Sequence, residues 1–83
     1  MHHHQLLNSV RDQVQDTLIR LGAEDTPPQE TILIRDGIYC GRRFYVDDYM
    51  AVWFIEEGEI KFFDQDGAVA SVERIQTEER RAA

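Results

Sequence analysis

The sequence predicts a small α+β domain in which one N-terminal helix packs on a five-stranded antiparallel β-meander. Three observations lead to this fold class. Apolar residues recur at helical spacing near the N-terminus, and from Glu30 onward short β-branched and aromatic runs alternate with turn residues. The connections between those runs are too short for crossover helices, so neighbouring strands must be antiparallel.

The predicted helix lies within residues 5–22. Its apolar residues stand three or four positions apart and so share one stripe, formed by Leu7, Val10, Val14, Leu18 and Leu21. Gly22 is a suitable stop, because glycine readily adopts the left-handed conformation that ends many helices. The Pro27-Pro28 pair then excludes helix from the linker over residues 23–29.

Five runs that are typical of β-strands follow the linker. They cover residues 30–35, 38–46, 49–56, 59–65 and 68–75. The turn signals between them are Asp36-Gly37, Asp47-Asp48, Glu57-Gly58 and Asp66-Gly67. The two Asp-Gly pairs suit type I′ turns, which need a positive φ at both central residues. These turns predict a meander in which each strand pairs with the next.

Two-residue turns also determine which residues face each other across the strands. The predicted pairs are Leu33–Cys40, Cys40–Ile55, Arg42–Trp53, Phe44–Ala51, Ile55–Ile60 and Trp53–Phe62. One face then carries Leu33, Ile38, Cys40, Phe44, Val46, Ala51, Trp53, Ile55, Ile60, Phe62 and Val69. The opposite face carries Ile32, Ile34, Tyr39, Gly41, Tyr45, Met50, Val52, Phe54, Phe63, Ala68, Ala70 and Val72.

Both faces of the predicted sheet are therefore apolar, whereas a half-exposed antiparallel sheet normally has one polar face. One helix cannot cover both, and we expect it to cover the more aliphatic face, which holds Trp53. The second face would then be closed by coiling toward a partial barrel, by a homodimer, or by another protein or an apolar ligand. As a contact surface it would consist of Tyr39, Gly41, Arg43, Tyr45, Met50, Val52, Phe54 and Phe63. Gly41 would leave a flat spot there for a partner to approach.

Composition and charge narrow the possible functions. The 83 residues suit one domain over residues 5–83, after a leader over residues 1–4 that we interpret as disordered or as a tag remnant. A formal net charge of −7 opposes direct binding to nucleic acids or to anionic membranes. Acidic residues near the predicted turns would form a rim of Asp47, Asp48, Glu56, Glu57 and Glu59. With one cysteine, and no apolar run near the roughly 20 residues of a membrane span, we expect a cytoplasmic protein.

Few residues of the chain suit catalysis or metal binding. Cys40 is the only possible thiol nucleophile, but all three histidines lie in the leader, so we expect no catalytic dyad. Arg42 is expected to stack on Trp53 across the strands. Residues 64–67 resemble part of a calcium-binding loop, but Phe62 stands where the first ligand should be, so a hairpin turn is expected instead. We predict no cofactor and no metal site.

These observations together favour a non-enzymatic protein-interaction module. It would self-associate through the second apolar face, most simply as a homodimer, because two-fold symmetry is the commonest form of self-association. The alternative is an acidic regulator that occupies a basic site on a partner, such as a nucleic-acid-binding protein. A small enzyme is the third and least supported class.

Overall fold

The computed structural model describes residues 3–75. Residues 1–2 and 76–83, which the prediction assigned to the leader and to the end of the domain, lie outside the described residues. The elements in chain order are α1 (His3–Leu21), β1 (Gln29–Arg35), β2 (Ile38–Val46), β3 (Tyr49–Phe54), β4 (Glu59–Phe63) and β5 (Val69–Arg74). The strands form one sheet in the order β1-β2-β3-β4-β5, and each neighbouring pair is antiparallel. The predicted helix and five-stranded meander are thus confirmed.

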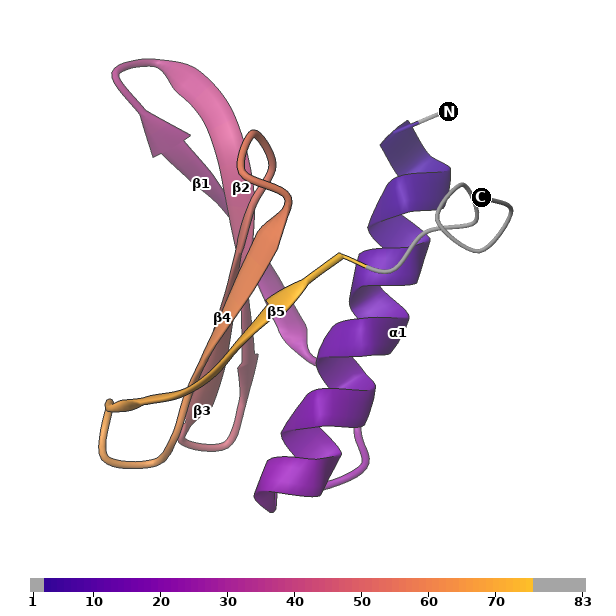
Figure 1. Cartoon of the computed structure of the whole chain (residues 1–83), viewed down its shortest axis with the longest axis vertical. Helices are drawn as coiled ribbons and strands as arrows, with labels where there is room; N and C mark the ends of the chain where they lie inside the picture. The colour runs from indigo at the N-terminus through magenta and orange to yellow at the C-terminus, as the bar shows by residue number, and fades with distance from the viewer. Residues whose placement is uncertain (1–2, 76–83) are drawn as a thin grey trace.

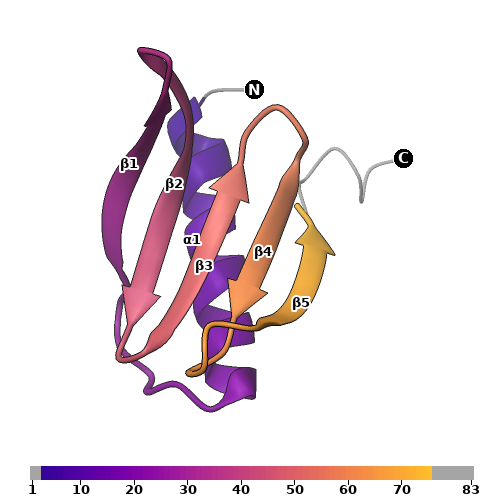
Figure 2. The ribbon, with the colours of Figure 1, turned by 90° about the vertical axis from the view of Figure 1, so that its left-hand side faces the viewer.

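The helix lies along one side of the sheet, and no described element covers the other side (Figure 1, Figure 2). The sheet is open, because β1 and β5 lie at opposite edges and do not meet. The predicted coiling toward a partial barrel is therefore wrong: the sheet neither closes nor curls strongly. The second face remains on the surface of the molecule, and we call it the open face.

The core lies between α1 and the face of the sheet that holds Trp53, as predicted. Val10 and Val14 of the helical stripe are completely buried, and the neighbouring leucines on the stripe are buried or partly buried. Across from them, Trp53, Phe44 and Phe62 are the largest completely buried side chains among the described residues. This packing fixes which side of the sheet the helix occupies.

Both ends of α1 lie close to the predicted ends. The helix begins at His3, so it includes two residues that the sequence assigned to the leader. It ends at Leu21, and the next residue, Gly22, has a positive φ of 120° and donates its N–H to the carbonyl of Leu18 at 3.1 Å. Gly22 is thus the predicted stop.

The two Asp-Gly turns have different conformations. Asp36-Gly37 has φ values of 55° and 76°, which confirms the type I′ turn. In the second turn Gly67 has a φ of 84° but Asp66 has no positive φ, so the type I′ prediction is wrong there. The reason is Asp64, whose Oδ1 accepts the backbone N–H groups of Asp66 (2.9 Å) and Ala68 (3.0 Å). This side-chain bonding, common for aspartate in turns, builds a longer loop.

The β3–β4 connection is also longer than predicted. The N–H of Gly58 lies 3.0 Å from the carbonyl of Phe54 and 3.2 Å from that of Ile55, so residues 55–58 form a four-residue turn. Trp53 consequently pairs with Ile60, and the predicted Trp53–Phe62 and Ile55–Ile60 pairs do not form. Because the pairing shifts by two residues, the side chains of β4 keep their predicted faces.

A β-bulge in β2 alters the end of the β1–β2 hairpin. Leu33 pairs with Gly41 and Ile34 pairs with Tyr39, which leaves Cys40 as an extra residue in the ladder, so the predicted Leu33–Cys40 pair is wrong. A shift of one residue exchanges the faces. Leu33 therefore lies on the open face, whereas Ile34, Tyr39 and Ile32 lie on the helix side, opposite to the prediction.

Gly41 makes this bulge possible. It is buried, and a Cβ at this position would overlap the backbone carbonyl oxygen of Trp53 and would lie 3.6 Å from Cδ2 of Leu33. β2 and β3 thus approach more closely than a side chain at position 41 would allow. The flat spot predicted for a partner is filled by the chain's own atoms. The predicted Arg42–Trp53 and Phe44–Ala51 pairs form on either side of this point and are confirmed.

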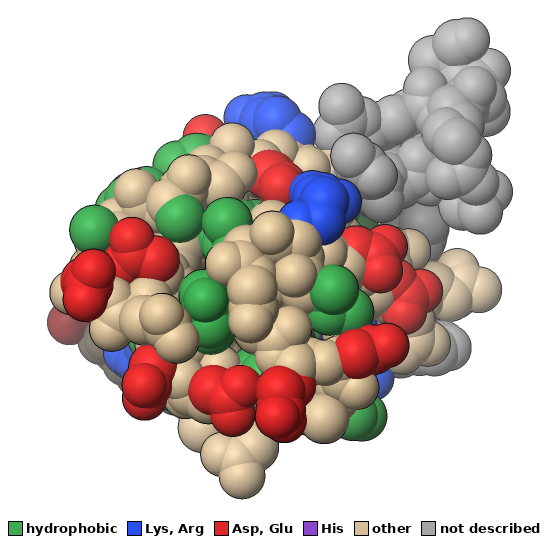
Figure 3. Space-filling view, turned by 90° about the horizontal axis from the view of Figure 1, so that it is seen from below, with side chains coloured by type: hydrophobic (Ala, Val, Ile, Leu, Met, Phe, Trp, Pro, Cys, Tyr) green, Lys and Arg blue, Asp and Glu red, His purple; other side chains and the backbone are tan. Residues whose placement is uncertain are grey.

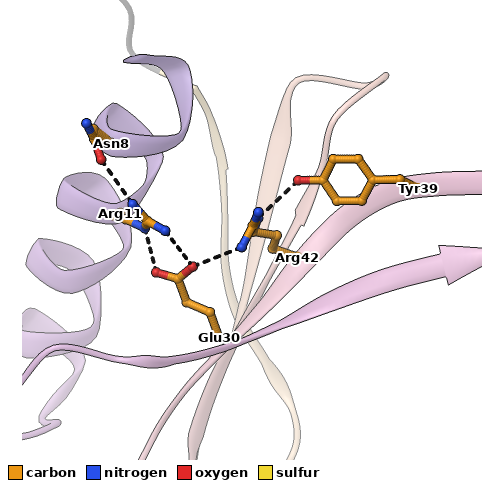
Figure 4. A network of polar contacts seen from close by, with 5 residues as sticks. All are labelled: Asn8, Arg11, Glu30, Tyr39 and Arg42. Carbon is orange, nitrogen blue, oxygen red and sulfur yellow. Dashed lines mark hydrogen bonds and ion pairs between the residues drawn. The ribbon is translucent and has the colours of Figure 1, made fainter. Parts of the chain in front are cut away.

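A glutamate of β1 joins the helix to one edge of the sheet. Glu30 accepts bonds from Arg11 of α1 at 2.6 Å and 3.1 Å and from Arg42 of β2 at 3.2 Å (Figure 4). The hydrogen bond to Glu30 raises the pKa of Arg11 above its ordinary value, although burial opposes the shift. Arg42 lies 5.8 Å from the ring centre of Tyr39 and donates to its hydroxyl, so the predicted stacking on Trp53 is wrong.

A glutamate of β5 joins the helix to the opposite edge. Glu73 accepts hydrogen bonds from the Gln13 amide at 2.9 Å and from the Thr17 hydroxyl at 3.0 Å, and both donors are buried on α1. Arg20 forms a longer ion pair with the same carboxylate at 3.4 Å. The two glutamates therefore hold the helix to the sheet on both flanks of the apolar stripe.

Candidate interaction surfaces

The open face carries seven of the eight residues predicted for the contact surface. They lie in three rows across the strands, which Lys61 and Glu59 of β4 complete: Tyr45–Met50–Phe63, Arg43–Val52–Lys61 and Gly41–Phe54–Glu59. The exception is Tyr39, which the bulge places on the helix side beside Arg42. The prediction of a shared face is thus correct for the interior of the sheet and wrong at the hairpin end.

The middle of the open face is covered by the protein's own side chains. Val52 is only 7% exposed, and Leu33 is buried beside Gly41. The ammonium group of Lys61 lies 5.6 Å from the ring centre of Phe54, at a distance where a cation attracts an aromatic ring. The middle of the face is therefore more polar and better packed than the alternation of residues indicated.

Among the described residues, the most exposed large apolar side chains lie at the edges of the sheet. On the β1–β2 hairpin, Ile32 and Ile34 are each 54% exposed and Ile38 is 66% exposed. Tyr39, beside them, is 36% exposed. We call these four residues the hairpin patch. Two valines, Val69 and Val72, are similarly exposed on β5 at the opposite edge.

The two edge strands differ in protection. Along β5, Gln13 of the helix donates to the backbone carbonyl of Arg74 at 2.8 Å, and the strand runs toward α1 (Figure 1). Along β1, the uncharged segment of residues 31–34 is bounded by Glu30, whose carboxylate is already paired, and by Arg35 at the end. In natural proteins, charges, prolines or bulges usually prevent an edge strand from pairing with another chain. Within residues 31–34, β1 itself has none of these.

The predicted acidic rim is divided between the two ends of the sheet. Asp47 and Asp48 lie in the β2–β3 turn at one end, whereas Glu56, Glu57 and Glu59 lie at the β3–β4 turn at the other. The antiparallel meander brings the β4–β5 loop to the same end as Asp47 and Asp48 (Figure 2). The rim is thus two separate clusters.

A hollow of about 470 Å³ lies between the β2–β3 turn and the β4–β5 loop. We call it the acidic hollow. It is lined by Tyr45, Asp47, Asp48, Tyr49, Met50, Phe63, Asp64, Gln65, Asp66 and Gly67. Acidic side chains surround apolar ones at this end of the molecule (Figure 3). Sequence reasoning assigned Asp64 and Asp66 to a turn and did not place them beside Asp47 and Asp48.

Cys40 has no acid–base partner in the structure described. Its thiol is half-buried, and Sγ lies 3.5 Å from the carbonyl oxygen of Leu33. In the described part of the chain, no three His, Cys, Asp or Glu side chains are placed so that they could hold a metal ion. The one described helix, α1, lacks the long apolar segment that would be needed to cross a membrane.

Comparison of the chain with protein-family models, with curated proteins and with solved structures finds no match. The arguments about function therefore rest on the residues and surfaces of this chain.

Proposed function

We propose that the protein is a non-enzymatic interaction module that self-associates through the β1 edge and the hairpin patch. The observation that carries this proposal is the exposure of Ile32 and Ile34 on an unprotected edge strand. An edge strand presents unpaired backbone N–H and C=O groups, and these readily pair with a strand of another chain. The proposed surface is thus the β1 edge together with the hairpin patch, of which Ile32, Ile34 and Tyr39 lie on the helix side, rather than the middle of the open face.

A second copy of the chain fits this edge well, because the sequence around Leu33 is nearly symmetrical. In an antiparallel pair centred on Leu33, Ile32 of each chain lies opposite Ile34 of the second copy. Thr31 lies opposite Arg35, so no like charges oppose each other within residues 31–35. Only the outermost pair, Glu30 with the turn residue Asp36, sets two acids opposite each other. The two five-stranded sheets would join into one continuous sheet, with a two-fold axis at Leu33.

The expected dimer is weak and depends on concentration. Covering the exposed half of an isoleucine side chain contributes about 1 kcal/mol, and the symmetrical pair covers four such side chains. Backbone hydrogen bonds across the two β1 strands add to this gain, whereas the loss of freedom on association opposes it. A dissociation constant in the micromolar to millimolar range is the expected result.

Sedimentation equilibrium at protein concentrations up to about 1 mM tests the proposal. The wild-type chain should approach the mass of a dimer, and Ile34→Lys should remain monomeric. Val72→Lys is the matched control, because Val72 has a similar exposure of 52% on the opposite edge strand. Circular dichroism would show that both variants keep the native fold.

Two results would contradict the proposed mode of self-association. One is a wild-type chain that stays monomeric at the highest concentration. The other is a dimer that survives Ile34→Lys but is lost in Val72→Lys, which would assign self-association to β5 instead.

A further inference from the structure

The acidic hollow combines an apolar floor with an anionic border. Tyr45, Met50 and Phe63 are partners in one row across β2, β3 and β4, and each is partly exposed. Two aromatic rings and a thioether therefore meet at the surface of the open face, beside the two turns. A volume of about 470 Å³ lies within the range of pockets that bind small ligands or single side chains.

Among the residues that the structure describes, no lysine or arginine lines the hollow, so none of them neutralises its carboxylates. In the described structure, the ion pairs of the chain involve Glu30, Glu59 and Glu73, and none involves an aspartate. Asp64 uses one carboxylate oxygen to bind backbone N–H groups of its own loop, and no described basic side chain forms an ion pair with it. The hollow is thus a region of concentrated negative potential.

The other end of the sheet shows that this imbalance is local. A smaller hollow there, about 310 Å³, contains Glu57 and Glu59, but Arg35 and Lys61 line it as well. Its charges are balanced in number. Acidic residues therefore occur at both ends of the sheet, but the acidic hollow, unlike this smaller one, has no described basic side chain in its lining to balance them.

We propose that the acidic hollow binds a basic segment of another protein, with an arginine or lysine side chain seated on the Tyr45–Met50–Phe63 floor. Aromatic faces attract cations, and the effect increases when nearby carboxylates supply opposite charge. The same sheet already holds cations on rings at two places, Lys61 over Phe54 and Arg42 over Tyr39. Because the carboxylates do not converge as metal ligands do, an extended organic cation matches them better than a metal ion does.

This binding site is independent of the proposed self-association. β2 runs from Ile38, which belongs to the hairpin patch, to Val46, beside the acidic hollow, so the two surfaces lie at opposite ends of one nine-residue strand (Figure 2). A dimer joined along β1 would leave the acidic hollow of each copy accessible. Such a dimer would therefore be bivalent for a basic partner. Each surface can therefore be altered without changing the other.

Fluorescence anisotropy with the full chain tests this inference. The probe is a fluorescein-labelled peptide of alternating glycine and arginine, and a peptide of alternating glycine and glutamate is its control. The arginine peptide should bind at low ionic strength and should weaken as salt is added, because exposed charges are screened. The glutamate peptide should not bind.

Two double variants separate the acidic hollow from the overall charge of the protein. Asp47→Asn with Asp48→Asn removes two charges at the hollow and should weaken binding of the arginine peptide roughly fivefold to tenfold. Glu56→Gln with Glu57→Gln removes two charges at the other end and should change binding by less than about twofold. Asn suits position 47, where Asp47 has a positive φ of 53°, so the fold should be preserved.

A third variant addresses the apolar floor. Tyr45→Leu retains an apolar side chain but removes a ring, and it should also weaken binding if the cation rests on the aromatic face. Equal weakening by the two double variants, or binding of the glutamate peptide as strong as that of the arginine peptide, would overturn the proposal. Failure of the arginine peptide to bind at low salt would overturn it as well. None of these results depends on whether the chain forms a dimer.

Discussion

Removal of the Glu73 carboxylate tests the account of how the helix is held to the sheet. In Glu73→Ala, the buried Gln13 amide loses one acceptor but keeps the carbonyl of Arg74, and the Thr17 hydroxyl loses its acceptor on β5. Arg20 loses an ion pair, but its side chain is 67% exposed. The loss should therefore come mainly from the two buried donors.

The magnitude follows from these contacts. A shielded hydrogen bond to a charged group contributes about 1.5 kcal/mol or more, whereas an exposed ion pair contributes no more than about 0.5 kcal/mol. Glu73→Ala should therefore lower the free energy of unfolding by about 3 kcal/mol, which for a domain of this size corresponds to a fall in Tm of about 15 °C. Glu73→Gln keeps the length of the side chain and one acceptor oxygen, and it should lose about half as much.

Thermal and urea unfolding followed by circular dichroism would measure both effects. Glu57→Ala is the matched control, because it removes the same charge from an exposed turn. If Glu73→Ala and Glu57→Ala have Tm values within a few degrees of each other, the Glu73 carboxylate does not hold the helix in the way described.

Two further substitutions test the hairpins. Gly41→Ala should lower the free energy of unfolding by about 3 kcal/mol in urea denaturation, because its Cβ meets the Trp53 backbone, whereas Gly37→Ala, with open space around its Cβ, should cost only about 1 kcal/mol through its positive φ. Similar costs at the two glycines would contradict the close approach of β2 and β3. Asp36→Val should cost about 1–2 kcal/mol by the same measurement, because a β-branched residue disfavours the positive φ of the type I′ turn, and Asp36→Asn should be nearly neutral. A neutral Asp36→Val variant would argue against that turn.

The fold was predictable because its signals are local. The spacing of the helical stripe and the brief turns determined the element order and the antiparallel pairing, and the buried position of Trp53 followed from strand alternation. The errors occurred where a side chain or a close contact overrides the turn signal. Asp64 bonds to its own backbone and lengthens one loop, and Gly41 accommodates a bulge that alternation alone does not reveal.

The candidate surfaces were less predictable than the fold. The alternation of side chains along the strands predicted an apolar open face. It does not reveal that Lys61 covers Phe54 or that Val52 is buried. The acidic hollow depends on two turns that are distant in sequence. Strand directions in a meander would have placed Asp64 and Asp66 at the same end as Asp47, so this part was within reach of the sequence.

The bulge at Cys40 allows the β1–β2 hairpin to combine two different strand registers. A two-residue turn at positions 36 and 37 pairs residues whose numbers sum to 73, but the pairing of Glu30 with Phe44, which brings Glu30 to Arg11, needs a sum of 74. Cys40 acts as a one-residue spacer between these two requirements. The same spacer determines which face of the sheet the β1 side chains occupy, because it turns Ile32 and Ile34 toward the side of the helix. Any chain that pairs with β1 there would therefore also approach the flank of α1.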